Sequence, residues 1–253
     1  MMQSPIFSII TITYNASRWL ETTILSILSQ SYPHIEYIII DGASLDGTVD
    51  IIKQYASGVT YWSSESDKGI YDAMNKGLQK ATGDYVWFIN AGDTLDTSDT
   101  VQHVASLITK KKVLPDIIYG ETNIIDESGH FLGMRRLKAP KKLTWKSFRM
   151  GMLVCHQSFV VRRTVAPPFD LTYHYSSDFD WSIRCMKNSK KICNTRMILS
   201  NFMDGGVSSS QRKASLKERY EIMCRYYGKI STSLLHIWFA IRFYSARYLK
   251  RTV

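Results

Sequence analysis

Three aspartates in the first hundred residues each follow a short apolar segment rich in β-branched side chains. These aspartates are Asp41, Asp67 and Asp93. Such segments predict buried strands, and parallel sheets bind their ligands beyond the carboxyl ends of the strands. Three carboxylates at one edge crowd it with negative charge, which a cation bound together with a nucleotide would relieve. The spacing therefore predicts a site for a divalent cation and a nucleotide.

The segments that position these carboxylates alternate between strand and helix patterns. Strand-like runs cover residues 6–13, 35–40, 59–63 and 85–89. Helical spacing of apolar residues covers 19–28, 49–55 and 71–81 between them. The alternation predicts an α/β domain with a mostly parallel sheet and helices on both faces. After residue 100 the pattern loosens, and we expect strands at 117–120, 131–136 and 154–162 and helices at 99–110 and 177–187.

Charge divides the chain into an acidic front and a basic back. Residues 1–100 carry 5 basic and 12 acidic side chains, residues 101–210 carry 17 and 8, and residues 211–253 carry 10 and 2. We expect no nucleic acid partner, because the acidic front repels phosphates and the chain lacks zinc-finger, RNP-type and homeodomain patterns. The basic excess indicates anionic phospholipid or a diphosphate-bearing substrate; a merely solvated basic surface is the alternative.

Residues 231–251 combine an apolar-aromatic stripe with four basic side chains. The apolar run stops at Arg242, far short of the ~20 residues that span a bilayer, which predicts a helix lying in a membrane interface. A terminal helix packed on the rest of the chain is the alternative. The N-terminus lacks the features of a secretory signal and the four cysteines lack metal-ligand spacing, so we expect a cytoplasmic protein with free thiols.

Three longer segments together resemble a known family. They are SIITITYN, ILSQSYPHIEYIIIDGASLDGT and SESDKGIYDAMNKGLQKATGDYVWFINAGD. They are similar to the nucleotide-binding half of family 2 glycosyltransferases with the GT-A fold, and SDKGIYDAMNKG resembles the branch that builds colanic acid and O-antigen polysaccharides. The resemblance returns at CHQSFVVRR, SSDFDW and GGVS. It implies a catalytic domain over residues 1–210, with a nucleotide-binding half (1–100) and an acceptor-side half (101–210), and a helical basic tail over 211–253.

Candidate contacts for the nucleotide sugar lie at the strand ends and on the helix after Asp67. The residues that suit a flat slot for uracil or guanine are Thr11, Tyr14, Asn15 and Asp41. The others that the resemblance assigns to the nucleotide sugar are Asp67, Lys68, Asn75, Lys76, Asn90, Ala91 and Gly92. Met74 stands where family members carry arginine, and we expect Lys68 or Lys76 to supply the missing charge. For Asp41, an ordinary turn is the alternative.

The run Asn90-Ala91-Gly92-Asp93 occupies the place of the family's DxD motif, with Asp93 as its only carboxylate. Mg²⁺ or Mn²⁺ can use one carboxylate together with waters and substrate phosphates. The resemblance therefore implies a metal ion at Asp93. An aspartate that caps the following segment is the alternative.

The run SSDFDW matches the family's Glu-Asp motif, with Ser177 in place of glutamate. The match implies that Asp178 is the base that removes a proton from the acceptor hydroxyl. An aspartate favoured by the helix dipole is the alternative. Further candidate contacts to the acceptor or the diphosphate are His156, Gln157 and Arg212.

The resemblance implies inverting transfer of a hexose from a UDP-sugar or, less frequently in the family, a GDP-sugar. The acceptor would be a lipid-diphosphate-linked glycan or an oligosaccharide at the inner face of the cytoplasmic membrane. The pathway would be bacterial surface polysaccharide synthesis, such as lipopolysaccharide O-antigen, colanic acid or capsule. A nucleotidyltransferase is one alternative, although ITYNASRW lacks a glycine-rich phosphate loop. A non-catalytic membrane-docking protein is the other, and it leaves the strand-end carboxylates unexplained.

Overall fold

The computed structural model describes residues 4–205 and 211–249. Within them one sheet of nine strands has the order β3-β2-β1-β4-β8-β6-β9-β5, and β7 pairs with β6. The strands are β1 (Phe7–Thr13), β2 (Ile35–Asp41), β3 (Tyr61–Ser64), β4 (Tyr85–Phe88), β5 (Thr94–Leu95), β6 (Ile117–Ile125), β7 (Phe131–Met134), β8 (Phe159–Arg162) and β9 (Ile192–Met203). The α-helices are α1 (Leu20–Leu28), α2 (Thr48–Gln54), α3 (Ile70–Lys80), α4 (Thr100–Thr109), α5 (Ser177–Asn188), α7 (Arg212–Tyr227) and α8 (Lys229–Leu249).

The first half of the sheet is entirely parallel. β1 pairs with β2 and with β4, and β2 pairs with β3, all in the same direction. Every residue of β1 is buried, as expected for a strand that helices cover on both faces. The predicted alternation of strands and helices up to residue 89 is therefore confirmed, and the carboxyl ends of β1 to β4 meet at one edge.

The second half of the sheet is mixed. β8 runs antiparallel to β4 and β6, β6 runs parallel to β9, and β5 runs antiparallel to β9. The α/β fold class is confirmed. The first half of the sheet is the all-parallel part, and β6 and β9 form a parallel pair in the second half. The predicted strand 154–162 was wrong in its first part, because a short 3₁₀ turn, η3 (His156–Ser158), precedes β8. β9 was not predicted, because polar residues interrupt the apolar pattern of its sequence. Within the strand, Arg196 has a left-handed backbone conformation (φ 58°).

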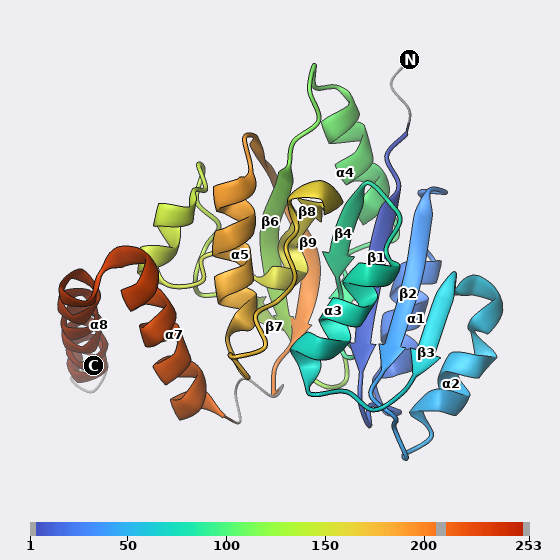
Figure 1. Cartoon of the computed structure of the whole chain (residues 1–253), viewed down its shortest axis with the longest axis horizontal. Coiled ribbons are helices and arrows are strands. Elements are labelled where there is room, and N and C mark those ends of the chain that lie inside the picture. The colour runs from blue at the N-terminus through green and yellow to red at the C-terminus, as the bar shows by residue number, and fades with distance from the viewer. Residues whose placement is uncertain (1–3, 206–210, 250–253) are drawn as a thin grey trace.

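Two apolar cores lie on opposite faces of the sheet. One contains Met74 of α3 and Trp181 of α5, and the other contains Ile24 of α1 together with the buried face of α4. Ile10 of β1 belongs to the first core and Ile9 to the second, because neighbouring strand residues point to opposite faces. Figure 1 shows α3 and α5 in front of the sheet and α1 and α4 behind it.

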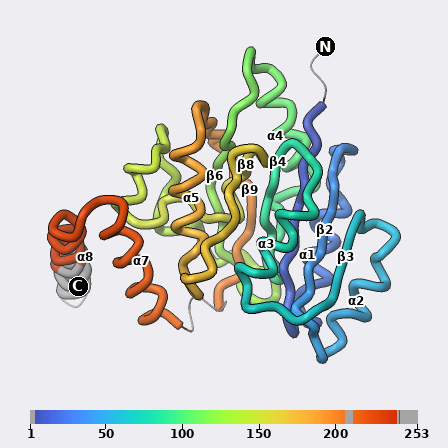
Figure 2. Tube along the Cα trace, viewed as in Figure 1, coloured from blue at the N-terminus to red at the C-terminus, as the bar shows by residue number. Residues whose placement is uncertain are grey.

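The helices α7 and α8 form a pair at one end of the molecule, with α7 next to α5 (Figure 2). The hydroxyl groups of Ser215 on α7 and Ser176, just before α5, lie 3.0 Å apart. Tyr220 of α7 and Ser233 of α8 share a hydrogen bond of 2.8 Å. No helix in the described ranges combines the length and the apolar character that crossing a bilayer requires.

Helix α3 lies close to β1 because Gly77 has no side chain. A Cβ atom at this position would lie 2.5 Å from Cγ2 of Ile10, which is fully buried. Real Cβ contacts are not that short, so a side chain would push α3 away from the strand.

We expect Gly77→Ala to lower the free energy of unfolding. Overpacking a core costs about 1–3 kcal/mol, which equals or exceeds the ~1 kcal/mol by which alanine favours a helix. Urea unfolding followed by circular dichroism measures the change. The control is Gln79→Ala on the exposed face of α3, which should change stability by less than about 0.5 kcal/mol. A higher unfolding midpoint for Gly77→Ala would contradict the close packing.

Candidate functional site

The loops after β1 and β2 are joined by a chain of hydrogen bonds that starts at Asp41. Its carboxylate accepts from the backbone N–H of Ser44 (2.9 Å) and from the hydroxyls of Ser44 (2.5 Å) and Ser64 (2.6 Å). The Ser44 oxygen accepts from the N–H of Asn15 (2.8 Å), and the Asn15 side-chain oxygen accepts from the N–H of Leu45 (3.0 Å). Asp41 is fully buried. The carboxylate of Asp41 therefore stabilises the turn after β2, and it is not exposed to a nucleobase.

Tyr14 and Asp67 form an open surface beside these loops. A Cβ atom at Gly42 would lie 2.7 Å from Oδ2 of Asp67 and 3.2 Å from Cδ2 of Tyr14, so both side chains lie against this glycine. Tyr14 is 66% exposed, and Asp67 accepts from the N–H of Gly69 through its other oxygen (2.8 Å). An accessible aromatic ring beside a carboxylate can stack on a flat base and accept hydrogen bonds from it.

The two candidate lysines differ in their contacts. The Lys76 ammonium donates to the carbonyl of Ser66 (2.9 Å) and pairs with Glu65 (3.1 Å). Lys68 is exposed two residues before α3 and has no ion-pair partner in the described ranges. Lys68 is therefore the lysine whose charge remains available to a ligand.

Two predicted contacts have their polar atoms committed to the fold. The Thr11 hydroxyl donates to the carbonyl of Ile89 (2.8 Å) and lies 3.1 Å from the hydroxyl of Tyr37. The Asn75 amide accepts from the N–H of Phe169 (2.7 Å) and donates to its carbonyl (3.0 Å). Buried polar groups need partners, and here the partners are protein atoms. The structure therefore does not present Thr11 or Asn75 as free groups at the site.

Asp93 is buried at the junction of the β4 end, η3 and β9. Its Oδ2 accepts from Nε2 of Gln157 (2.7 Å) and its Oδ1 accepts from the N–H of Met203 (3.0 Å). Only 4% of Asp93 and 1% of Gln157 are exposed. Burial raises the pKa of Asp93 to about 6, although both hydrogen bonds act to lower it.

These contacts do not fit Asp93 as a direct ligand of Mg²⁺ or Mn²⁺. Such an ion needs carboxylate oxygens turned toward it, whereas each oxygen of Asp93 faces an N–H donor. No three His, Cys, Asp or Glu side chains gather into a possible metal cluster in the part of the chain that the structure describes. The geometry gives Asp93 and Gln157 a structural role.

The other residues of the DxD-like run are Asn90, which lies beside His156, and Ala91 and Gly92. Nδ2 of Asn90 lies 3.3 Å from Nε2 of His156, and the Asn90 Oδ1 atom is buried without a hydrogen-bond partner among the described residues. The N–H of Ala91 bonds the backbone of β1. Gly92 has a φ of 97°, and a Cβ there would lie 2.5 Å from Cε of Met203.

Asp178 lies in the first turn of α5, 9% exposed, between two side chains from other elements. The hydroxyl of Tyr71 on α3 donates to its Oδ1 (3.1 Å), and Nδ1 of His156 lies 3.4 Å from its Oδ2. A continuous chain of side-chain contacts therefore runs from the end of β4 to α3, through Asn90, His156, Asp178 and Tyr71.

The environment of Asp178 keeps its carboxylate ionised. Burial acts to raise the pKa of Asp178, but the hydrogen bond and charge of His156, the charge of Arg219 and the Tyr71 hydroxyl outweigh burial, and the pKa lies below its ordinary value. An ionised carboxylate near neutral pH can accept a proton. By contrast, Asp180 is fully buried, pairs with Arg184, and accepts from the Tyr226 hydroxyl (2.8 Å).

Tyr71 and Arg219 were not predicted as site residues. Tyr71 stands in the motif SDKGIYDAMNKG, and its position at the start of a helix that faces the strand ends was a usable signal. Arg219 is one of ten basic residues after residue 210, and nothing in the local pattern separates it from the others. Arg212 is exposed at the first residue of α7. Most of the GGVS motif falls in 206–210, outside the described residues.

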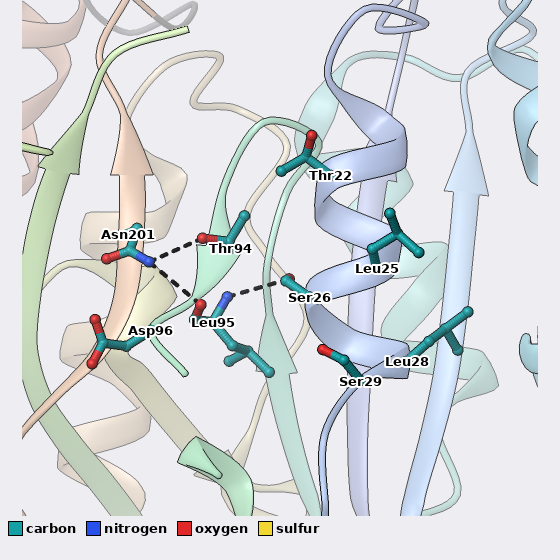
Figure 3. Close-up of a pocket in the computed structure, with 9 residues that line it drawn as sticks. All are labelled: Thr22, Leu25, Ser26, Leu28, Ser29, Thr94, Leu95, Asp96 and Asn201. Carbon is teal, nitrogen blue, oxygen red and sulfur yellow. Dashed lines mark hydrogen bonds between the residues drawn. The ribbon is translucent and has the colours of Figure 1, made fainter. Parts of the chain in front are cut away.

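A shallow hollow of about 590 Å³ lies between α1 and β5 (Figure 3). It is lined by Thr22, Leu25, Ser26, Leu28, Ser29, Thr94, Leu95, Asp96 and Asn201. None of these is a candidate site residue. The hollow borders α1, whose buried face belongs to the core opposite to that of α3 and α5, so it is separate from Asp178.

Comparisons with known proteins bear on the family and the fold of the chain. The profile described as Glycosyl transferase family 2 matches residues 8–166. The chain is 29% identical to a PGL/p-HBAD biosynthesis glycosyltransferase of Mycobacterium bovis over 94% of this chain and 92% of the relative. Among solved structures, Staphylococcus aureus TarS 1-349 in complex with UDP has a TM-score of 0.69 at 15% identity, over 95% of this chain and 72% of that one.

A second similar structure is the mannosyltransferase PcManGT from Pyrobaculum calidifontis in complex with GDP-Man and Mn²⁺. Its TM-score is 0.65 at 16% identity, over 92% of this chain and 70% of that one. At this identity the two structures establish the fold alone, which is the GT-A fold.

We expect Asp93→Asn to remove part of the pH dependence of stability. The folded pKa of about 6 lies above the ordinary 3.8, so Asp93 stabilises the fold fully below about pH 4 and loses this contribution as pH rises through 6. A shift of about 2 pKa units corresponds to about 3 kcal/mol.

Urea unfolding of the wild type and Asp93→Asn at several pH values measures this effect. The difference in unfolding free energy should shift in favour of the variant between pH 4 and pH 7 by up to about 3 kcal/mol. The exposed Asp50→Asn on α2 serves as the control. A difference that stays constant with pH would show that Asp93 does not titrate as its burial implies.

Proposed function

The chain belongs to glycosyl transferase family 2, and from this premise we propose that it transfers a hexose from a nucleotide-diphosphate sugar to an acceptor hydroxyl with inversion. The observation that carries the proposal is the ionised Asp178, which is linked to the end of β4 through His156 and Asn90. A base beside the strand ends meets a nucleotide sugar where parallel sheets hold their ligands. Family membership favours a transferase over a nucleotidyltransferase or a non-catalytic docking protein.

In the proposed reaction Asp178 accepts the proton of the acceptor hydroxyl as that oxygen attacks the anomeric carbon. The new C–O bond forms on the face opposite the departing group. The bond from the anomeric carbon to the phosphate oxygen breaks, and the nucleoside diphosphate leaves with the electron pair. The proton lost by the acceptor hydroxyl is held at Asp178, and the electron pair of the broken bond leaves with the nucleoside diphosphate.

The proposed donor slot uses Tyr14, Asp67 and Lys68. Tyr14 would stack on the base, Asp67 would accept from its polar edge, and Lys68 would lie near the diphosphate at the N-terminus of α3, where helix N–H groups favour anions. UDP is the proposed nucleotide and GDP the alternative; TarS and PcManGT, which share the fold, were solved with UDP and GDP-Man. PcManGT also contained Mn²⁺, but Asp93 does not fit such an ion here, so the mechanism assigns the ion no step.

We place the reaction at the inner membrane surface, on a lipid-diphosphate-linked glycan of a bacterial surface polysaccharide. Helix α8 carries an exposed apolar stripe made of Ile230, Leu234, Ile237, Trp238 and Ile241. Residues at this spacing share one helical face. The segment 211–253 adds a net charge of +8, which attracts an anionic membrane surface.

We expect Asp178→Asn to reduce turnover by about 10²–10⁴-fold, the usual contribution of a general base. UDP or GDP release from a panel of UDP- and GDP-hexoses, with lipid-diphosphate-linked glycans as acceptors, measures turnover. Calorimetry with UDP should show nearly unchanged affinity, because the base acts in the chemical step. Asp50→Asn, an exposed aspartate on α2, is the matched control. Turnover of Asp178→Asn within tenfold of the wild type would refute the assignment.

We expect the triple variant Leu234→Ser, Ile237→Ser and Ile241→Ser to lose binding to anionic vesicles. The wild type should float with phosphatidylglycerol vesicles at low salt and be partly released at high salt, because basic residues supply the screened part of the affinity and the stripe supplies the rest. Leu216→Ser changes a single exposed apolar residue of α7 and is the control. If the triple variant floats as well as the wild type, the stripe does not face the membrane.

A further inference from the structure

A second hollow, of about 580 Å³, lies where β6 and β9 begin, and positive charge surrounds it. Six of its eleven lining residues are basic, and none of the other five is acidic. We call it the basic hollow, and its six cations are Lys111, Lys112, Lys141, Lys190, Lys191 and Arg196. All six are exposed. They are six of the seventeen basic residues between 101 and 210, so a large share of the basic excess of that segment gathers at one place.

The basic hollow lies at the edge of the sheet opposite to the candidate site. Strand β8 runs antiparallel to both β4 and β6, so β6 has the same direction as β4, and β9 is parallel to β6. The starts of β6 and β9 therefore lie away from the carboxyl ends of β1 to β4. Figure 1 shows the links from α4 to β6 and from α5 to β9 at the top of the molecule, whereas β1, β2 and β3 point to the bottom. The hollow is thus separate from Asp178 and from the proposed donor slot.

Asp116, just before β6, fixes the chain that carries two of the cations. Its Oδ2 atom accepts from the backbone N–H groups of Lys190 (2.7 Å) and Lys191 (3.0 Å), and its own N–H donates to the Lys191 carbonyl (2.8 Å). Its Oδ1 atom lies 3.4 Å from Nε of Arg162. Asp116 is not among the residues that line the hollow. Its carboxylate therefore holds the backbone of the two lysines in place and leaves their ammonium groups unpaired.

Asn194 links two further segments of the hollow. Its Nδ2 atom donates to the carbonyl of Pro140 (3.0 Å), next to Lys141, and its Oδ1 atom accepts from the N–H of Arg196 (2.7 Å). Arg196 has a φ of 58°, a conformation that is uncommon for a residue with a side chain. The hydrogen bond from Arg196 to Asn194 holds the backbone at this position. The cations thus belong to segments that the fold itself ties together.

The charge of the basic hollow has no counterpart in the protein. Within the described ranges, none of its six cations forms an ion pair with a carboxylate. Like charges that line one concave surface reinforce each other's potential and attract anions. Lysine and arginine are the side chains that bind phosphate oxygens. The volume falls in the range of sites for small ligands, about 300–1,000 Å³, and a concave surface fits such a ligand better than a flat bilayer.

We propose that the basic hollow binds a soluble anion with several clustered phosphate groups, such as an inorganic polyphosphate or a nucleotide polyphosphate. A single phosphate would leave most of the six cations without a partner, whereas clustered phosphates reach several of them at once. The site does not depend on the proposed transfer reaction, because it shares no residue with the donor slot or with the base. A phospholipid headgroup offers the same phosphate chemistry, and the test separates it from a soluble ligand.

The test is titration calorimetry of the full-length protein with sodium tripolyphosphate at a constant ionic strength of about 0.15 M. The double variant Lys190→Glu with Lys191→Glu reverses two charges at the hollow. The matched control, Lys213→Glu with Lys217→Glu, makes the same change in net charge at two exposed lysines of α7. The variant Lys68→Ala reports on binding at the proposed donor slot. Thermal unfolding shows which variants are folded, and Lys190→Gln with Lys191→Gln replaces the glutamate pair if that pair does not fold.

The wild type should bind tripolyphosphate, and reversal of Lys190 and Lys191 should weaken the affinity at least about tenfold, because two attractive charges become repulsive. The control pair and Lys68→Ala should each stay within about threefold of the wild type, since neither changes the hollow. Flotation with phosphatidylglycerol vesicles should not depend on Lys190 and Lys191.

Four results would overturn the inference. The first is a wild type that does not bind tripolyphosphate. The second is equal weakening by the hollow pair and the control pair, which would show a response to net charge alone. The third is loss of binding in Lys68→Ala with no loss in the hollow pair, which would place the anion in the donor slot. The fourth is a hollow pair that loses vesicle binding but keeps its affinity for tripolyphosphate, which would identify a lipid contact. Failure of the transfer reaction is separate, since it would appear as an active Asp178→Asn enzyme.

Discussion

The candidate site depends on keeping the carboxylate of Asp178 ionised although it is almost completely buried. A buried charge is costly unless hydrogen bonds and opposite charges surround it. Asp178 receives a hydrogen bond from Tyr71 of α3 and lies beside His156 of η3, and the charge of Arg219 on α7 also lowers its pKa. The need to gather them explains why segments that are far apart in the chain converge at the start of α5.

The strand-end aspartates are held differently, although they look alike in the sequence. Asp41 and Asp93 are buried and use their oxygens for N–H and hydroxyl donors of neighbouring loops. Asp67 remains beside the exposed ring of Tyr14. The edge of the sheet thus contains two carboxylates that shape the loops and one that is open to a ligand, so the crowding of charge inferred from the sequence is relieved mostly by protein donors.

Much of the fold could be predicted because its signals are local. The apolar runs of β1, β2 and β4 and the helical spacing of α3 show directly in the sequence, and the start of α5 placed Asp178 correctly on a helix. Long-range contacts could not be predicted in the same way. The pairing of Asn75 with the Phe169 backbone and the hydrogen bond from Tyr71 to Asp178 join residues distant in sequence. The strand β9 escaped prediction because polar residues break its pattern.

The contact between Gly92 and Met203 has a consequence for how this family can vary. Gly92 combines a positive φ with a Cβ position that Met203 already fills. An acidic side chain at position 92 would therefore require both a different loop backbone and a smaller or displaced residue at 203. Positions 92 and 203 should consequently change together among homologues, with a larger side chain at 92 accompanied by a smaller one at 203.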